Sequence, residues 1–216
     1  MTRPATRRRD KLAPDPDVRR AIVVAASKAL REQGVRGLSV AAVLDHAQLS
    51  TRAFYRHFES KDELVTAVFL EMAHAEMRRL KRKMSKAATP VEAVAAWIDG
   101  RLDLAFDATI KSDLRQLSLE AQSQMFASPE LIQPAYTQML EPLTEQLRRG
   151  LEVGVFYDID PTNDAQSIHG VVWAAIERHW RTGDCDRGDV RRTTLQFCLR
   201  GLGVTPKTVA QLALPD

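Results

Sequence analysis

The sequence contains few cysteines and no long apolar run. Only Cys185 and Cys198 occur among its 216 residues, and they match neither a metal-binding spacing nor a disulfide framework. No segment approaches the roughly 18 to 20 uninterrupted apolar residues of a membrane span, and the N-terminus lacks the apolar stretch of a secretory signal. These absences favour a protein of the reducing cytoplasm, without a metal site, a disulfide scaffold or a membrane partner.

Catalytic motifs are also missing. The chain has no Ser/His/Asp order, no glycine-rich phosphate loop, no His-Glu-x-x-His and no paired metal-ligand motif. His74 lies near Glu71 and Arg78 on one predicted helix face, but salt bridging along a helix accounts for that grouping. The other histidines are scattered, at positions 46, 57, 169 and 179. The sequence therefore predicts a protein that is not an enzyme and requires no cofactor.

Strand-like alternation, internal repeats and low-complexity runs are absent, whereas apolar residues recur at helical spacing from residue 17 onward. This spacing predicts an all-α chain of about nine helices. We expect Asp17, Ser39, Ser50 and Ser60 to cap the first four of them. The predicted helices cover about 17–34, 39–46, 50–57, 60 onward, 90–102, 112–126, 129–152 (kinked at Pro134 and Pro142), a segment that contains 168–179, and 188–202.

Basic residues are concentrated at one end of the chain. Residues 1–64 hold 13 Lys and Arg against 8 Asp and Glu, a net charge of +5, whereas residues 65–216 hold 18 against 20, a net charge of −2. This difference indicates a head that binds a polyanion and a body with another role. We expect three regions: a flexible basic arm over 1–16, an N-terminal three-helix domain over 17–62 and a larger helical domain over 63–216.

Residues 39–64, SVAAVLDHAQLSTRAFYRHFESKDEL, carry the most specific pattern. A short amphipathic helix, a tight turn and a second short helix rich in Arg, Tyr and His lead into a third helix that opens on Ser60-Lys61. Apolar residues are spaced so that they join the first two helices: Val40, Val43, Leu44, Ala47, Leu49 and Phe54. This is the pattern of a helix-turn-helix that enters the major groove of DNA.

Over residues 17–64 the chain resembles the DNA-binding domain of the tetracycline-repressor (TetR) family of bacterial transcription regulators. The matching elements are Gly34, Ser39-Val40, Ala47, Leu49-Ser50, Phe54-Tyr55-x-His57-Phe58 and Ser60-Lys61-Asp62-Glu63-Leu64. The sequence departs from the family at Val43-Leu44, where Ile-Ala is usual, and at Gln48, where the turn usually has Gly. Gln48 must therefore adopt a left-handed backbone, at about 1 kcal/mol, or relax the turn.

The exposed edge of the second helix predicts the contacts with DNA. Arg52 can pair with guanine, and Thr51 can contact a base or a thymine methyl. The resemblance implies that Ser39, Tyr55, His57 and Lys61 meet phosphates, and Arg56 is a further phosphate candidate; for His57, packing is an equal alternative. The predicted DNA-binding residues are Ser39, Ser50, Thr51, Arg52, Tyr55, Arg56, His57 and Lys61.

Two other basic segments allow more than one interpretation. The arm, with Arg3, Arg7, Arg8, Arg9 and Lys11, either enters a minor groove or is a solvated tail. The run of Arg78, Arg79, Lys81, Arg82, Lys83 and Lys86 is interpreted as a solvated helix end that complements the dipole of its own helix.

For the body, the resemblance implies a helical domain for ligand binding and dimerisation. Large or polar residues on its predicted helices are candidates for a ligand pocket, although each taken alone is more often a core residue than a ligand contact: Trp97, Arg101, Phe106, Met125, Phe126, Tyr136, Met139, His169 and Trp173. The last two long helices are the predicted dimer interface, because the final one is apolar around much of its circumference. The interface candidates are Val172, Ile176, Val190, Leu195, Phe197, Cys198, Leu199 and Leu202.

Taken with the resemblance, these features predict a sequence-specific regulator, most simply a repressor. It would bind a palindromic operator in double-stranded DNA as a homodimer and be released by a small-molecule effector. The alternative is a ligand-independent DNA-binding or helical interaction protein with weak specificity.

Overall fold

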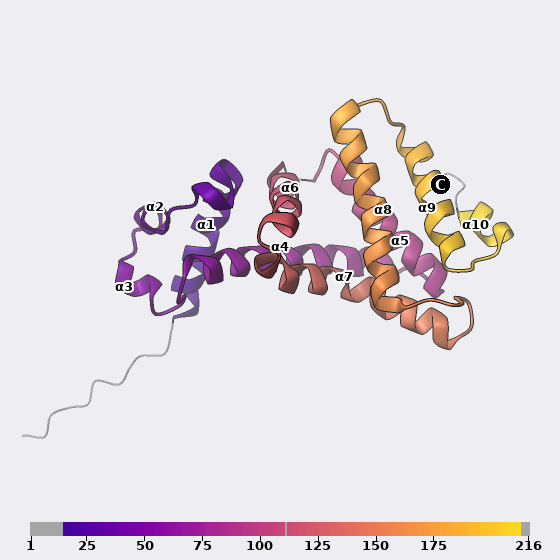
Figure 1. Cartoon of the computed structure of the whole chain (residues 1–216), viewed down its shortest axis with the longest axis horizontal. Coiled ribbons are helices and arrows are strands. Elements are labelled where there is room, and N and C mark those ends of the chain that lie inside the picture. The colour runs from indigo at the N-terminus through magenta and orange to yellow at the C-terminus, as the bar shows by residue number, and fades with distance from the viewer. Residues whose placement is uncertain (1–14, 111, 213–216) are drawn as a thin grey trace, which may run out of the picture. The chain divides into compact units, whose positions relative to one another are not determined.

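The computed structural model describes residues 15–110 and 112–212, and in these residues it contains helices and turns but no strand (Figure 1). This confirms the all-α prediction, with one more helix than expected. The missed helix is the last one, whose 7 residues are too few for an apolar period to show. The elements are α1 (Pro16–Gly37), α2 (Val40–His46), α3 (Thr51–Phe54), α4 (Lys61–Met84), α5 (Pro90–Phe106), α6 (Ser112–Ala127), α7 (Pro129–Glu152), α8 (Pro161–Thr182), α9 (Arg187–Gly201) and α10 (Pro206–Leu212).

The chain divides into two compact units, one up to Val68 and the other from Phe69 onward. The division falls inside α4, so the first residues of this helix belong to unit 1 and the remainder belongs to unit 2. Most of the arm predicted over residues 1–16 lies outside the described residues.

Unit 1 is a small helical domain whose helices begin at side-chain caps. The hydroxyls of Ser39, Ser50 and Ser60 each accept a backbone N–H three residues further on, at 3.4, 3.2 and 3.1 Å, which confirms these caps. At α1 the prediction was wrong by two residues. Asp15 is the cap, because its carboxylate accepts the N–H of Asp17 at 2.9 Å and Pro16 occupies the first helical position.

Unit 2 is built around α5, a helix that is buried on nearly every side. Thr89 caps it and Pro90 begins it. Helices α7, α8 and α9 pack against α5, while α6 packs on α7 and α10 on α9. Apolar residues of these helices form one continuous core in which Trp97, Ile98 and Leu102 have no exposed surface. Of these helices, α5, α6, α7 and α8, together with α4, line the cavity described below.

Candidate functional site

The turn between α2 and α3 fixes the geometry of the helix-turn-helix. Gln48 adopts a left-handed backbone with φ 54°, which is one of the two alternatives that the sequence left open. The N–H of Leu49 closes the turn on the carbonyl of Leu44 at 2.9 Å. Leu44 and Phe54 are almost fully buried, so α2 and α3 share an apolar contact surface. The turn therefore forms without glycine, at a strain of about 1 kcal/mol.

The recognition helix α3 is shorter than predicted. It ends at Phe54, whereas the sequence predicted a helix as far as residue 56 or 57. The N–H groups of Arg56 and His57 bond three residues back, to Ala53 at 3.3 Å and to Phe54 at 2.8 Å. The last turn is therefore tightened, and Tyr55, Arg56 and His57 follow the helix as a turn.

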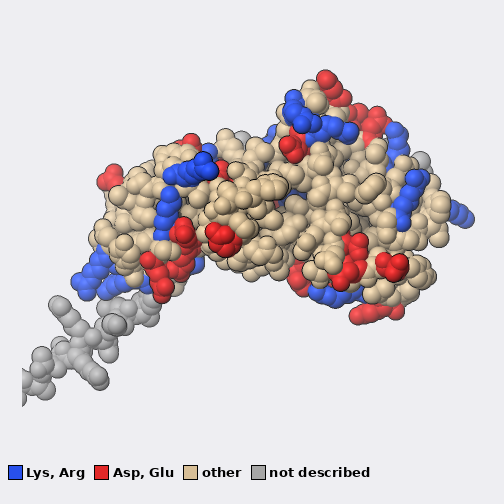
Figure 2. Space-filling view, in the orientation of Figure 1, with Lys and Arg blue, Asp and Glu red and all other residues tan. Residues whose placement is uncertain are grey.

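The side chains that were predicted to contact DNA lie along this exposed edge of unit 1. Thr51, Arg52, Tyr55 and Arg56 are exposed, and Tyr55 keeps 67% of its surface. Lys and Arg side chains lie at the end of unit 1 that carries α3, with Asp and Glu nearby (Figure 2). Such an edge offers cationic and hydroxyl groups to a polyanion.

The other four predicted DNA-binding residues are either already hydrogen-bonded or partly buried. Ser39 and Ser50 are exposed, but their hydroxyls already accept the capping hydrogen bonds, so only their donor capacity is free for a phosphate. His57 and Lys61 are half-buried. Lys61 is the first residue of α4, where free backbone N–H groups favour an anion.

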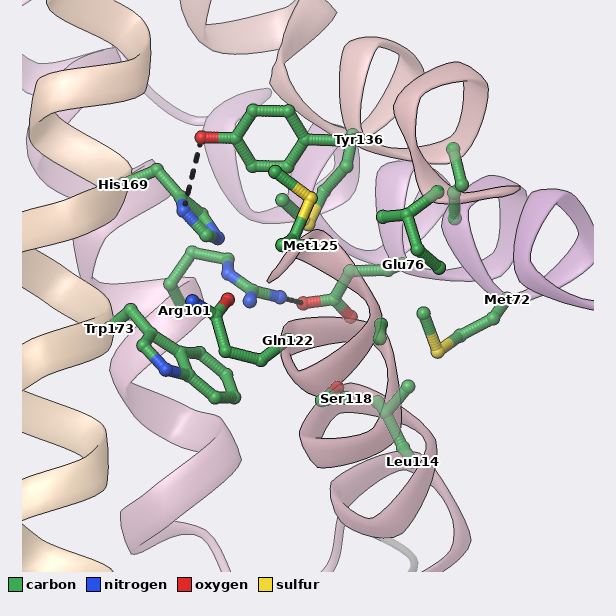
Figure 3. Close-up of a pocket in the computed structure, with 15 residues that line it drawn as sticks. Met72, Glu76, Arg101, Leu114, Ser118, Gln122, Met125, Tyr136, His169 and Trp173 are labelled. Atoms are coloured by element: carbon green, nitrogen blue, oxygen red, sulfur yellow. Dashed lines mark hydrogen bonds and ion pairs between the residues drawn. The ribbon is translucent and has the colours of Figure 1, made fainter. Parts of the chain in front are cut away.

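Unit 2 contains a cavity in which a volume of about 50 Å³ is accessible to a water-sized molecule, within about 510 Å³ of space between atoms that includes open solvent. Five helices, α4 to α8, contribute to its lining (Figure 3). Six of the nine predicted pocket residues line this cavity: Arg101, Met125, Tyr136, Met139, His169 and Trp173. The rest of the lining is Met72, Ala73, Glu76, Leu114, Ser118, Ala121, Gln122, Ile132 and Ala135.

The structure places the other pocket candidates elsewhere. Trp97 is fully buried in the core and does not line the cavity. The Phe106 ring lies against His179, with centroids 4.1 Å apart. Phe126 is 86% exposed. For these three residues the prediction of a cavity position was wrong, because helical spacing does not show which apolar face meets a cavity and which meets another helix.

A buried ion pair forms the polar end of the cavity. Arg101 is 3% exposed and donates from Nη1 to Oε1 of Glu76 at 2.7 Å. Arg79 donates to the same carboxylate twice, from Nε and Nη2, both at 2.8 Å. Burial acts to raise the pKa of the Glu76 carboxyl, but the hydrogen bond from Arg79 and the charge of Arg101 outweigh it and lower that pKa. Glu76 is therefore an anion held by two arginines.

A second carboxylate, Asp103, lies beside two further cations and shares Arg79 with Glu76. Lys83 lies 2.5 Å from Asp103, Arg187 at the start of α9 lies 2.8 Å away, and Arg79 lies 3.5 Å away. The interpretation of the basic run 78–86 as a solvated helix end is thus wrong for Arg79 and Lys83. These two residues bind acids on α5 or on α4 itself.

Sequence reasoning missed Glu76, although a signal was present. Helix α5 reads WIDGRLDLAF at its end, so Asp99, Arg101 and Asp103 alternate within an otherwise apolar segment. Charged residues in a buried helix must find partners. That requirement points to ion pairs with other helices, but it does not identify Glu76.

Tyr136, His169 and Trp173 form an aromatic row beside the ion pair. The rings of Tyr136 and His169 are 5.1 Å apart, those of His169 and Trp173 are 6.4 Å apart, and Trp180 lies 5.7 Å beyond Trp173. The Tyr136 hydroxyl is 3.5 Å from Nδ1 of His169. Burial, followed by the charge of Arg101, lowers the pKa of His169 to about 3, and burial raises the pKa of Tyr136. Both groups are uncharged near neutral pH.

The predicted dimer residues are mostly internal. Seven of the eight lie in the core of unit 2: Val172, Ile176, Val190, Leu195, Cys198, Leu199 and Leu202. Helix α9 is apolar on several sides because α5, α8 and α10 surround it, so these residues are not surface contacts for a partner. Phe197, by contrast, is 67% exposed.

A helix-turn-helix with an exposed cationic edge is joined in one chain to a helical unit with a cavity. Residues 22–68 fit the family model of "Bacterial regulatory proteins, tetR family". The match lies within unit 1 and agrees with the sequence resemblance over residues 17–64.

Solved structures share the fold across both units. RolR in complex with resorcinol aligns with a TM-score of 0.63 at 20% identity and covers 93% of this chain and 96% of its own. FadR from Bacillus subtilis in complex with stearoyl-CoA aligns at 0.63 and 20%, over 85% and 96%. FadR from Bacillus halodurans aligns at 0.66 and 20%, over 88% and 99%. At these identities the likeness establishes the fold alone.

No curated protein sequence matches the chain. In the part of the chain that the structure describes, no three His, Cys, Asp or Glu side chains are grouped so that they could hold a metal ion. None of the helices described over 15–212 is both long and apolar enough to cross a membrane.

Proposed function

We propose that the protein is a transcriptional repressor that binds a palindromic operator as a homodimer and leaves it when a small molecule occupies the cavity of unit 2. The observation that carries the proposal is the exposed edge of α3, held on a buried core, within a domain that matches the tetR family. Repression is the default sign, since most members of the resembled family repress.

Arg52 and Thr51 are the proposed base-reading residues, because they are exposed at the start of α3. The forked guanidinium of Arg52 suits O6 and N7 of a guanine. Tyr55, Arg56 and Lys61 would hold phosphates and set the register of the helix on the duplex.

The exposed faces of α8 and α9 are the proposed dimer surface. On α8, Gly170 and Ala174 are exposed, and on α9 Phe197 and Gly201 are exposed. A Cβ at Gly170 or Gly201 would meet no neighbouring atom, so these surfaces leave room for a second helix pair. A twofold dimer would present two copies of α3, which is why the operator is expected to be palindromic.

The cavity of unit 2 is the proposed effector site. Proteins of the same fold have been solved with resorcinol and with stearoyl-CoA, so the fold accommodates ligands of very different sizes. The ligand would favour a conformation of the dimer whose two DNA-binding units no longer fit successive grooves, which shifts the population away from the operator.

The test is binding of the purified protein to the DNA that flanks its own gene, titrated against random competitor DNA at near-physiological salt. We expect a preference of about a thousandfold or more for one site. Arg52→Ala should remove about 1–3 kcal/mol of that preference, whereas Arg148→Ala, which removes an exposed arginine of α7, should leave it unchanged. Binding no better than to competitor DNA would contradict the proposal.

The same experiment tests one alternative function. A weakly specific DNA-binding or helical interaction protein would bind all sequences with the same strong salt dependence. In that case Arg52→Ala would weaken binding to operator and competitor DNA equally.

A further inference from the structure

The polar end of the cavity contains a hydrogen-bond donor that nothing in the described chain satisfies. Arg101 is buried, and its Nη1 donates to Glu76 at 2.7 Å, but its Nε–H has no acceptor among the described residues. Buried donors are nearly always paired, so an unpaired one on a cavity wall indicates an acceptor that the chain itself does not supply.

Glu76 does not leave room for a cationic ligand. Its Oε1 accepts from both Arg79 and Arg101, and its Oε2 accepts from Arg79. A ligand cation would have to displace one of these arginines. Four cations, Arg79, Arg101, Lys83 and Arg187, are paired with only two carboxylates, Glu76 and Asp103, so the charged groups at this end of the cavity carry an excess positive charge. Guanidinium groups remain protonated in proteins.

The rest of the lining is uncharged. Ser118, Gln122, Tyr136 and His169 provide hydrogen-bonding groups, and the low pKa of His169 keeps its imidazole neutral near pH 7. The other nine lining residues are apolar: Met72, Ala73, Leu114, Ala121, Met125, Ile132, Ala135, Met139 and Trp173. Figure 3 shows Arg101, Gln122, His169 and Trp173 around the same space, with Met72 and Leu114 at its other side.

We propose that this cavity selects an organic acid: a ligand with an apolar body and one carboxylate, whose oxygen accepts the free Nε–H of Arg101. The apolar body lies against Trp173 and the methionines, whose flexible side chains adapt to its shape. The carboxylate reduces the excess positive charge at this end of the cavity. This inference rests on the proposed effector site and specifies the chemistry of its ligand.

A purely structural role for Arg101 explains the geometry less well. Arg79 already gives Glu76 two hydrogen bonds, and Arg101 adds a third from Nη1 while its Nε–H is left without a partner in the described chain. Burying a second guanidinium is costly, and here it leaves an N–H without a partner. An acidic ligand accounts for both features.

The experiment measures ligand binding to the full-length protein by calorimetry, with matched probes that share a body and differ in the head group. One set is octanoate, methyl octanoate and octylamine, and the other is 3-phenylpropionate, its methyl ester and 3-phenylpropylamine. Because a hydrogen bond to a charged group is among the stronger ones, we expect at least one acid to bind about tenfold or more tightly than its ester and its amine. If neither acid outbinds its ester, or an amine binds best, the proposal is wrong.

Variants show whether Arg101 is responsible. Arg101→Gln should bring acid and ester to within about twofold of each other while leaving the ester affinity almost unchanged. Arg115→Gln is the matched control, since Arg115 also has a buried Nε without an acceptor in the described chain but does not line the cavity; the preference should persist. Should Arg101→Gln not fold, Arg101→Lys, which keeps the charge but lacks the Nε–H, should reduce the preference at least threefold. A variant that folds and keeps the full preference would overturn the proposal.

Measuring the release of the protein from operator DNA distinguishes a failure of this inference from a failure of the proposed function. If the acids bind through Arg101 but leave DNA binding unchanged, the head-group inference holds and the effector mechanism fails. If a neutral or cationic compound releases the operator while the acids do not bind, the effector mechanism holds and the inference fails.

Discussion

Units 1 and 2 place their charged side chains in opposite environments. In unit 1, Arg52 and Arg56 are exposed on the surface of a domain that has a small apolar core. In unit 2, Arg101 and Glu76 are almost completely removed from solvent and hydrogen-bonded to each other. Exposed charges contribute little to stability and remain available to a partner, whereas buried charges depend on one another. The comparison shows that the charges of Arg52 and Arg56 remain accessible to solvent, whereas those of Arg101 and Glu76 are first satisfied by each other.

The largest effect should follow from breaking the buried pair. Glu76→Ala leaves Arg101 buried without its carboxylate, so we expect the free energy of unfolding to fall by about 3–5 kcal/mol, measured by urea unfolding. Glu141→Ala is the control, because Glu141 makes an exposed pair with Arg148 at 3.6 Å; its effect should stay within about 0.5 kcal/mol. If both variants lowered the free energy of unfolding by the same amount, the buried pair would contribute no more to stability than an exposed pair.

A second effect should appear in the pH dependence of stability. Burial and the charge of Arg101 hold the pKa of His169 at about 3, below its ordinary 6.5, so the unfolded chain binds one more proton between these values. The contribution of His169 is therefore complete above about pH 6.5 and is lost as the pH falls towards about 3, at up to about 1.4 kcal/mol per pH unit.

His169→Gln should make this acid-side slope shallower by about one proton, measured by urea unfolding at a series of pH values. His74→Gln, which alters a half-buried histidine that does not line the cavity, should keep the wild-type slope. An unchanged slope in His169→Gln would mean that the imidazole is not held neutral in the folded chain.

The smallest effect concerns the turn of unit 1. Gln48 has φ 54°, which glycine adopts without strain. Gln48→Gly should therefore stabilise the chain by up to about 1 kcal/mol, seen as a higher midpoint of thermal unfolding. Gln48→Ala keeps a Cβ and should give no gain. A loss of stability on substitution by glycine would show that the Gln48 side chain stabilises the turn by some other contact.

Local signals in the sequence predicted most of the fold. Apolar spacing and the serine caps identified nine of the ten helices of the described chain, and of the two alternatives for Gln48, a left-handed backbone or a relaxed turn, the structure has the first. These features depend on residues within a few positions of each other. The error at Asp17 has the same origin, since Asp15 and Asp17 differ by two positions and both suit a cap.

The candidate sites were predictable only in part, because they depend on packing between distant segments. Six pocket residues were identified from their size and polarity, but the partner of Arg101 is 25 positions away in the sequence and was not. Asp103 and Arg187 are 84 positions apart. The dimer prediction for Leu195 and its neighbours failed because an apolar circumference is common to an interface helix and to a helix enclosed by its own chain.

All three tryptophans, Trp97, Trp173 and Trp180, belong to unit 2, and unit 1 has none. The indole fluorescence of the chain therefore reports on unit 2 alone, while its far-ultraviolet dichroism reports the helices of both units. If unit 1 unfolds first, helical dichroism will fall while the emission spectrum stays constant; if the units unfold together, both signals will change at the same denaturant concentration. The fluorescence of the native tryptophans can therefore distinguish the unfolding of the two units without any added dye.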